Sequence, residues 1–510
     1  MKRLLHLAIL FFVLASLTVT ASARTNENVY FLFDNRIIDT AETSAQYFVN
    51  TIDGESTNAA WLDQYSWSMD NADDIPIWEN RVTIMYPFVL FDEVGVSVDG
   101  VSPAPYKVWY HSWTNTSPTT NENWGGNILH AQNWEEVSAQ YPDMPSPRGV
   151  WHAGGHAICY MESTDGKTWT RPACGQFYYK NSDGTLIDTN IVFIGNHGSS
   201  VTLNEHPNAG STEPMFLMAG QATGTGSEGG VAVSWSENGI EWNDPITIKT
   251  KMEGSLYMKA DTQNQLHYST VLGKYVVITR GLPDNSEPNA SKRWIRTVLQ
   301  LSSNDNLQSI YQLKEISAQA GGQYWTETTK YWSDPTVVLS GTDDAQPYSM
   351  PVMCYENGYY IGVVSIADFK NGTAGEESYG KVHAELVWSP DMQTWYYLEQ
   401  GTPFIANDTT FALERGNAYG MVYCAAPIDA GTGLKIYYAA VPELHYMNYS
   451  EIPSNIKNTV DQAYPLAASK QAITRTTTLN VANLPYDAFA GYQVGSDASS
   501  AVITTVPFTL

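Results

Sequence analysis

Four carboxylates of this chain stand where two of them could work together as an acid and a base: Asp34, Glu79, Asp261 and Glu414. Burial and mutual repulsion keep one of two neighbouring carboxyls protonated near neutral pH, while the other stays ionised. Such a pair can protonate a leaving oxygen and activate an attacking water. Each of the four also has a structural alternative, such as an exposed loop position for Glu79 or an ion pair with Arg36 for Asp34.

Basic and imidazole side chains stand near the same places and are candidate substrate-binding groups: His197, Arg280, Arg296 and Arg415. An arginine there could bind a carboxylate or sulfate of a ligand through two parallel hydrogen bonds, or form a salt bridge between structural units. His197 is either a ligand contact or a structural histidine. We expect no metal and no cofactor, because His152 and His156 lie in a Gly-rich, non-helical stretch where i, i+4 spacing does not align two side chains.

A short turn recurs three times in the segments Ser163–Trp169, Ser236–Trp242 and Ser389–Trp395. Each copy has Ser first, Asp or Asn two residues later and Trp six residues after the Ser. Ser and Asx side chains bind nearby backbone N–H groups, so each copy predicts a locked hairpin. Asp165 and Asp391 are therefore interpreted as structural.

The turn belongs to a larger repeat in which an apolar run, a turn and a Tyr- and Val-rich run follow one another. Five such units occur, with their paired runs at 86–91 and 106–110, 200–203 and 215–218, 265–268 and 274–280, 350–355 and 359–364, and 420–423 and 434–438. Because one unit cannot bury its own face, neighbouring units must stack around an axis. The pattern predicts an all-β, five-bladed β-propeller. A two-sheet sandwich is the alternative, but it would not explain the recurring order.

The two ends of the chain differ from this repeat. Residues 1–23 have two basic residues, an apolar run and a small-residue cleavage site, which is typical of a signal peptide. Residues 24–450 are assigned to the propeller, 451–471 to a linker and 472–510 to a β-rich C-terminal extension. That extension either pairs with the first blade or begins a β-sandwich.

Composition narrows the partners and the compartment. The formal net charge of −26 argues against nucleic acid and anionic membranes as partners. Five N-x-Ser/Thr sequons are compatible with a secreted glycoprotein, at Asn115, Asn289, Asn371, Asn407 and Asn448. The four cysteines are compatible with one or two disulfides, and Cys159 and Cys174 flank the first turn motif. The 16 Trp and 32 Tyr residues include surface on which sugar rings could stack.

Several segments resemble secreted five-bladed propeller proteins related to glycoside hydrolase families 32 and 43. They are Phe31–Ile38, Trp78–Glu79, Glu162–Pro172, Asn190–Val192, His197–Gly198, Gly273–Arg280 and Arg293–Arg296. The resemblance is to loosely characterised relatives and not to the invertases, whose Asn-Asp-Pro-Asn-Gly opening is absent. Tyr86-Pro87 stands where a family 43 enzyme has Asp-Pro, and no Arg-Asp-Pro or Glu-Cys-Pro triplet occurs. The end of the chain from Leu484 resembles the beginning of the group's C-terminal β-sandwich.

The resemblance implies a secreted glycosidase that uses two carboxyls to cleave a sugar linkage. A carbohydrate is therefore the expected partner. A non-catalytic carbohydrate-binding propeller is the alternative, favoured by the missing triplets. A sialidase-like enzyme also carries such turn motifs, but it needs six blades, an arginine triad and a Tyr–Glu pair.

Overall fold

The computed structural model describes residues 31–506 with gaps. The longer gaps are 54–61, 69–75, 80–85, 114–127, 130–155, 223–229, 250–255, 284–294, 314–324, 328–330, 369–379, 411–415 and 446–476, and single or paired positions are not described elsewhere. The expected signal peptide, the whole expected linker and the sequons other than Asn407 lie outside the described residues.

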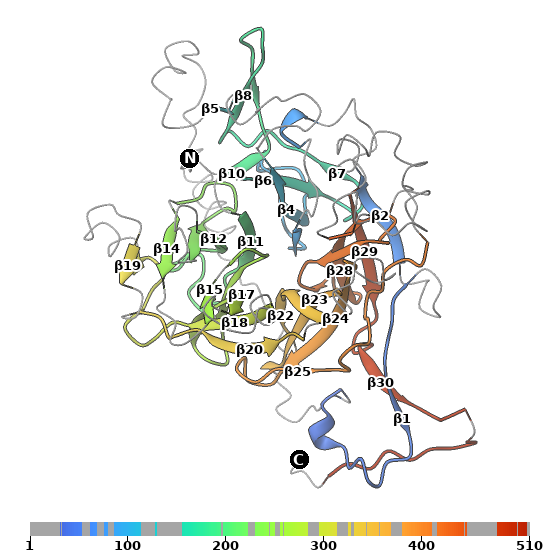
Figure 1. The fold of residues 1–510 in the computed structure, drawn as a ribbon. Helices are drawn as coiled ribbons and strands as arrows, with labels where there is room; N and C mark the ends of the chain where they lie inside the picture. Colours follow the sequence, from blue (N-terminus) through green and yellow to red (C-terminus); the bar gives the residue numbers. More distant parts are fainter. Residues whose placement is uncertain are drawn as a thin grey trace, which may run out of the picture.

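The first three blades are three separate sheets that follow one another around a common centre (Figure 1). The first contains β3 (Phe88–Phe91), β4 (Tyr106–Trp113), β6 (His156–Ser163) and β10 (Ile191–Ile194), with β7 (Trp169–Thr170) paired to β6. The second contains β11 (His197–Leu203), β12 (Phe216–Gln221), β13 (Val231–Ser236), β14 (Ile246–Lys249) and β19 (Trp325–Glu327). The third contains β15 (Leu256–Met258), β16 (Gln265–Ser269), β17 (Lys274–Pro283), β18 (Thr297–Ser302) and β20 (Thr336–Ser340).

The strands of the fourth and fifth blades are joined into one sheet through a parallel residue pair, Val382 in β24 and Met421 in β26. The fourth contains β21 (Ala345–Ser349), β22 (Val352–Cys354), β23 (Tyr360–Asp368), β24 (Val382–Ser389) and β25 (Tyr396–Tyr397). The fifth contains β26 (Met421–Cys424), β27 (Ile428–Asp429), β28 (Leu434–Val441), β29 (Thr478–Leu484) and β2 (Leu62–Ser68). The fold is thus an all-β, five-bladed β-propeller, and a six-bladed sialidase-like arrangement does not fit it.

Each of the five predicted run pairs is a pair of antiparallel neighbours at the inner side of a blade. These pairs are β3 with β4, β11 with β12, β16 with β17, β22 with β23 and β26 with β28. The repeat was visible in the sequence because each inner strand alternates with a turn rich in Gly or Asn.

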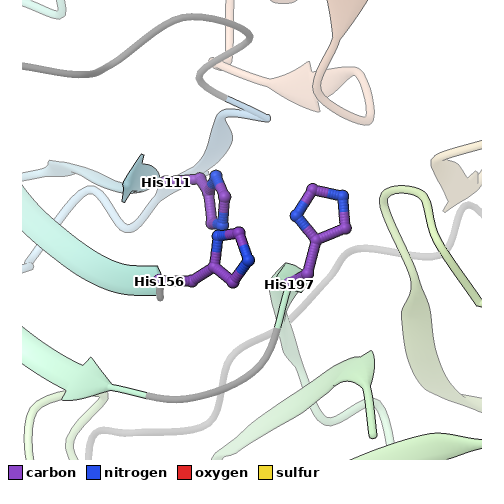
Figure 2. A group of neighbouring side chains, drawn as sticks. All are labelled: His111, His156 and His197. Atoms are coloured by element: carbon purple, nitrogen blue, oxygen red, sulfur yellow. The ribbon is translucent and has the colours of Figure 1, made fainter. Parts of the chain in front are cut away.

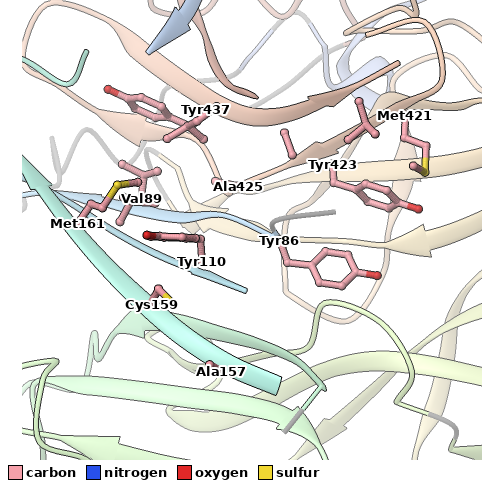
Figure 3. Packing of buried hydrophobic residues seen from close by; sticks show 14 of the residues in the cluster. Tyr86, Val89, Tyr110, Ala157, Cys159, Met161, Met421, Tyr423, Ala425 and Tyr437 are labelled. Carbon is pink, nitrogen blue, oxygen red and sulfur yellow. The ribbon is translucent and has the colours of Figure 1, made fainter. Parts of the chain in front are cut away.

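Five apolar clusters hold the blades together, one between each pair of neighbours. The cluster between the fifth and the first blade contains Val89 and Tyr110 from the first and Tyr423 and Tyr437 from the fifth (Figure 3). Both faces of the middle strands are consequently buried, as in β23, where every residue except the last is buried. The strands therefore read as nearly continuous apolar runs rather than as strict alternation.

The three turn motifs form the predicted locks. In the first, Ser163 Oγ accepts the N–H of Gly166 at 2.9 Å, and Asp165 Oδ1 accepts the N–H groups of Lys167 and Thr168 at 2.8 and 2.7 Å. The second and third copies repeat the two backbone contacts of Asp165 with Asn238 and Asp391. Asp165 and Asp391 therefore serve the backbone, as expected.

The fourth position of each motif also joins two blades. Tyr437 of the fifth blade donates its hydroxyl to the carbonyl of Gly166 in the first at 3.0 Å. Trp109 of the first blade donates Nε1 to the carbonyl of Gly239 in the second at 2.8 Å. Gln300 of the third donates to the carbonyl of Met392 in the fourth at 2.5 Å. The motif is thus a clasp between blades as well as a turn.

Both chain ends contribute to the fifth blade and to a short ribbon beside it. β29 pairs with β28 and β2 pairs with β29, so the segment that begins at residue 472 supplies a strand of the fifth blade rather than of the first. Beyond it, β1 (Gln46–Val49) pairs with β30 (Ala490–Gln493) outside the ring (Figure 1). No helical segment in the described part of the chain combines the length and the apolar character that a membrane crossing requires.

The cysteines do not form the disulfides that the sequence allowed. All four are free thiols. Cys159 packs in the cluster between the fifth and first blades, whereas Cys174 packs in the cluster between the first and second. The two thiols thus pack on opposite sides of the first blade. Asn407 is also committed structurally, because its Nδ2 donates to the carbonyls of Val382, Ala418 and Gly420.

Candidate functional site

Three histidines from separate strands meet at the centre of the ring. His111 lies in β4, His156 begins β6 and His197 begins β11. The ring centroids of His156 lie 4.7 Å from those of both His111 and His197, and the other pair is 5.2 Å apart. Figure 2 shows the rings of His111 and His156 beside each other and the ring of His197 facing them. We call these residues the histidine cluster.

Asp261 stands beside this cluster and is its nearest described carboxylate partner. One of its oxygens lies 3.3 Å from Nε2 of His197, and the other lies 2.9 Å from Nη2 of Arg280. The Asp261 side chain is 37% exposed, whereas those of His197 and Arg280 are almost completely buried. Two buried groups therefore hold one accessible carboxylate in a fixed position. All three were candidate site residues in the sequence, and the structure brings them together.

The loop before β16 holds Asp261 in place. Nδ2 of Asn264 donates to the carbonyls of Ala260 and Thr262, on either side of Asp261, at 2.9 and 2.8 Å. Ala260 has a φ of 53°, a left-handed conformation that costs a non-glycine residue about 1–2 kcal/mol. Gly198, next to His197, packs so closely on this loop that a Cβ atom there would lie 1.6 Å from the carbonyl oxygen of Thr262. Backbone contact between two blades thus sets the distance between His197 and Asp261.

Tyr86 is a strained residue at the same centre. It is buried and has a φ of 41°, an uncommon conformation for an aromatic residue. Its ring lies 5.9 Å from His111, 5.8 Å from His197 and 5.4 Å from Tyr423, measured between centroids. Strain of this kind persists where the surroundings fix the residue, and it is frequent at functional sites.

Two arginines flank one tyrosine on the other side of Asp261. The guanidinium carbons of Arg280 and Arg296 lie 4.9 and 5.4 Å from the ring centroid of Tyr348. Arg296 also donates Nη1 to Oε1 of Gln346 at 2.6 Å. His445 packs edge-on against the same tyrosine ring at 4.8 Å. The centre therefore receives polar side chains from all five blades.

Burial sets the protonation of these groups. It lowers the pKa of His111 well below its ordinary value, and the neighbouring His156 and His197 act in the same direction. Burial and His197 lower the pKa of His156 to about 3, against a smaller opposing effect of Asp261. Burial likewise raises the pKa of Tyr86 well above its ordinary value. At neutral pH, His111 and His156 are neutral imidazoles and Tyr86 is an un-ionised phenol.

Asp34 does not lie at this centre. Its Oδ2 accepts hydrogen bonds from Nη2 of Arg36 at 2.6 Å and from the hydroxyl of Tyr359 at 2.9 Å. Arg36 in turn lies over the ring of Trp388, which directly precedes the turn motif of the fourth blade. Asp34 is therefore at the motif end of its blade. β6 of the first blade has eight residues, from His156 at the central end to Ser163 at the motif end, a length of about 23 Å.

Glu79 is also held away from the centre, inside the first blade. Its side chain is fully buried and pairs with Arg171, whose Nη2 lies 2.9 Å from Oε2. Asn190 donates to Oε1 at 2.9 Å, and the hydroxyl of Tyr110 donates to the same oxygen. Tyr110 is adjacent to His111 in β4, so its side chain points to the opposite face of the strand. Glu79 thus occupies the fifth-blade side of the sheet.

Three of the residues that the sequence analysis considered for a ligand or metal site lie outside the described residues: His152, Glu414 and Arg415. Conversely, the sequence did not single out His111 or Tyr348, it noted Tyr86 only as a departure from the family 43 pattern, and it dismissed His156 as a metal ligand. The signal that could have found them is their position: they are polar or strained residues at those ends of the predicted strands that face the centre of the ring. His156 was judged against a helical spacing, whereas its true neighbours come from adjacent strands and the next blade.

Comparisons with known proteins give only distant likenesses. No protein-family model and no curated protein matches the sequence. Similar structures include an N-acetylgalactosamine deacetylase from F. plautii in complex with blood group B trisaccharide, at 10% identity over 85% of this chain and 96% of that chain, with a TM-score of 0.43. A thermostable family-43 glycoside hydrolase has 11% identity over 82% and 95% of the two chains, with a TM-score of 0.38. The catalytic domain of a GH62 α-L-arabinofuranosidase from Coprinopsis cinerea has 10% identity over 86% and 97%, with a TM-score of 0.38.

Proposed function

We propose that this protein is a secreted glycoside hydrolase that acts on an oligo- or polysaccharide at the centre of the propeller. The single observation that carries the proposal is Asp261, an accessible carboxylate held by His197 and Arg280 where all five blades converge. The guanidinium 2.9 Å away favours the ionised form of this carboxyl. Asp261 is thus suited to act as the base or the nucleophile, the ionised member of a carboxyl pair.

The second carboxyl is assigned to Glu414. The other two candidates, Asp34 and Glu79, are already held by arginine and tyrosine partners away from the centre. Glu414 precedes β26 in the chain, and the residues after it lead directly to the central end of that strand, where Met421 pairs with Val382. In this assignment Glu414 protonates the leaving oxygen.

The residues beside Asp261 give the site a preference for particular sugars. Arg280 and Arg296 are candidate partners for a negatively charged sugar, and His197 for a sugar hydroxyl. The similar structures include glycoside hydrolases and a complex with a trisaccharide. They do not select a linkage.

One observation favours a second candidate function. Only one of the four candidate carboxylates is placed at the centre by the described residues, whereas hydrolysis requires two. The competing function is a non-catalytic carbohydrate-binding propeller that uses the same central surface.

One experiment separates the two functions. Purified protein is screened against aryl-glycosides and polysaccharides, and the rate on any substrate found is compared with the rates of Asp261→Asn and Glu414→Gln. Asp183→Asn is the matched control, since Asp183 lies in an exposed turn. A glycosidase loses about 10²-fold or more of its rate in the first two variants and none in the control. Glycan binding without turnover would instead identify a binding protein, and unchanged rates in both variants would remove the two carboxyls from the mechanism.

A further inference from the structure

We propose that the histidine cluster binds one divalent first-row transition metal ion, with Zn²⁺ the best fit. One ligand atom from each of His111, His156 and His197 lies within 4.8 Å of those of the other two. The three residues come from β4, β6 and β11, so the fold and not a local sequence motif gathers them. This inference is independent of the proposed hydrolase activity, because it concerns a ligand that the histidines alone would hold.

The orientation of His197 supports a ligand role. Its Nε2 faces Asp261 at 3.3 Å. Figure 2 shows the other ring nitrogen, Nδ1, on the side that faces His111 and His156. Metal-binding histidines are regularly held in this way, with a carboxylate on one nitrogen and the metal on the other. Arg280 fixes the same carboxylate from behind at 2.9 Å, so the ring of His197 is held by two successive contacts.

The donor set selects the metal. Three imidazole nitrogens suit Zn²⁺, Cu²⁺, Ni²⁺ or Co²⁺, whereas Ca²⁺ and Mg²⁺ prefer oxygen ligands. Three protein ligands leave one position of a tetrahedral site open, which is the pattern of catalytic rather than structural zinc. That position would accept a water or a hydroxyl oxygen of a bound ligand.

The backbone around the cluster restricts how the rings can move. Zn–N bonds of about 2.0–2.1 Å place tetrahedral ligand nitrogens about 3.4 Å apart, so the metal would draw the three rings closer by rotation of their side chains. His111 and His156 start from a stacked arrangement in neighbouring strands, with ring planes at 24°. Gly198 and Thr262 hold the segment that carries His197. The site therefore closes around the metal without a change in the strands.

The test uses untagged full-length protein stripped with a chelator and then titrated with Zn²⁺ alone. Calorimetry and elemental analysis are expected to give one tightly bound ion per chain, and Co²⁺ should give the visible absorption of a four-coordinate site. His111→Ala, His156→Ala and His197→Ala should each lower the affinity by at least about 100-fold. His206→Ala is the control, since His206 packs on Tyr268 and Tyr275 away from the cluster.

Asp261→Asn guards against variants that fail to fold. It keeps all three imidazoles and should lower Zn²⁺ affinity by about 10–100-fold, as loss of a carboxylate behind a ligating histidine does. Retention of one tightly bound ion by all three alanine variants, or absence of stoichiometric Zn²⁺ binding by the folded wild-type protein, would overturn the proposal. Because no sugar enters the measurement, either result leaves the hydrolase proposal to be judged by its own experiment.

Discussion

Nε2 of His197 lies 3.3 Å from Oδ1 of Asp261, and this contact joins the second blade to the third at the centre of the ring. The two residues belong to different sheets, so their distance depends on how closely the blades approach. Gly198 sets that approach, since any Cβ at this position would collide with the carbonyl of Thr262. The candidate site is thus built by contact between blades.

Gly198→Ala should therefore destabilise the fold and change the distance between His197 and Asp261. Overpacking and left-handed backbone strain together should cost about 3 kcal/mol or more, because a Cβ would stand 1.6 Å from a backbone oxygen at a φ of +61°. Urea unfolding measures the loss. Gly175→Ala is the matched control, with a φ of +65° and open space around the added Cβ, so only about 1–2 kcal/mol of strain applies. Equal losses in the two variants would show that the approach of the blades is not what requires glycine at 198.

Glu79→Gln should affect stability and not the chemistry. The change removes the carboxylate that pairs with Arg171 in a fully buried place, and breaking such a pair costs about 3–5 kcal/mol. We expect a large fall in the urea midpoint and a rate per folded molecule within about threefold of wild type. Glu93→Gln, at an exposed position, is the control. A folded Glu79→Gln protein with a rate reduced a hundredfold would return Glu79 to the mechanism.

The turn locks should contribute a pH-dependent part of stability. Burial alone would raise the pKa of Asp165, but hydrogen bonds from Thr168, Lys167 and Ser163 outweigh it and lower the pKa to about 2. A carboxyl whose pKa is lower in the folded state stabilises the fold above its unfolded value of about 3.8, and this contribution is lost as the pH falls toward 2.

Asp165→Asn tests this, because the second motif already uses Asn238 in the same role. The variant should keep the turn and lose the part of the acid sensitivity that Asp165 causes. Unfolding midpoints of the two proteins are measured between pH 5 and pH 2. The difference between them should shrink as the pH falls, until the two midpoints cannot be distinguished near pH 2. Parallel curves across this range would contradict the assignment.

The clasp between the fifth and first blades predicts a further loss. Tyr437→Phe removes the hydroxyl that donates to the carbonyl of Gly166 and should cost about 1 kcal/mol in unfolding free energy. Tyr396→Phe is the control, at an exposed position in β25. If the two variants are equally stable, the clasp does not contribute to holding these blades together.

Much of the scaffold could be predicted from the sequence because short-range residue patterns specify its turns and strands. Ser163, Asp165 and Trp169 stand at fixed spacing, and the strands around each copy of the motif repeat, so the blades could be counted. The segment that contains β29 was expected to pair with the first blade or to begin a β-sandwich, whereas it supplies a strand of the fifth blade. No local pattern distinguishes a closing strand from the start of another domain.

Fewer of the site residues could be predicted, because they come together only when strands pair and blades pack against one another. His197, Asp261 and Arg280 were found from their places beside predicted inner strands. His111 and His156 required knowledge that β4 and β6 are neighbours, where Trp113 lies opposite His156. Asp34 and Glu79 were accessible to the same reasoning, but their arginine partners hold them elsewhere.

The central claim is that substrate binds beside Asp261 at the centre of the ring. Its most direct measurement is a crystal structure of the Asp261→Asn protein soaked with the oligosaccharide that the activity or binding screen identifies. We predict sugar density within hydrogen-bonding distance of residue 261 and Arg280, next to the histidine cluster. Density confined to another part of the surface, with the centre unchanged, would contradict the account.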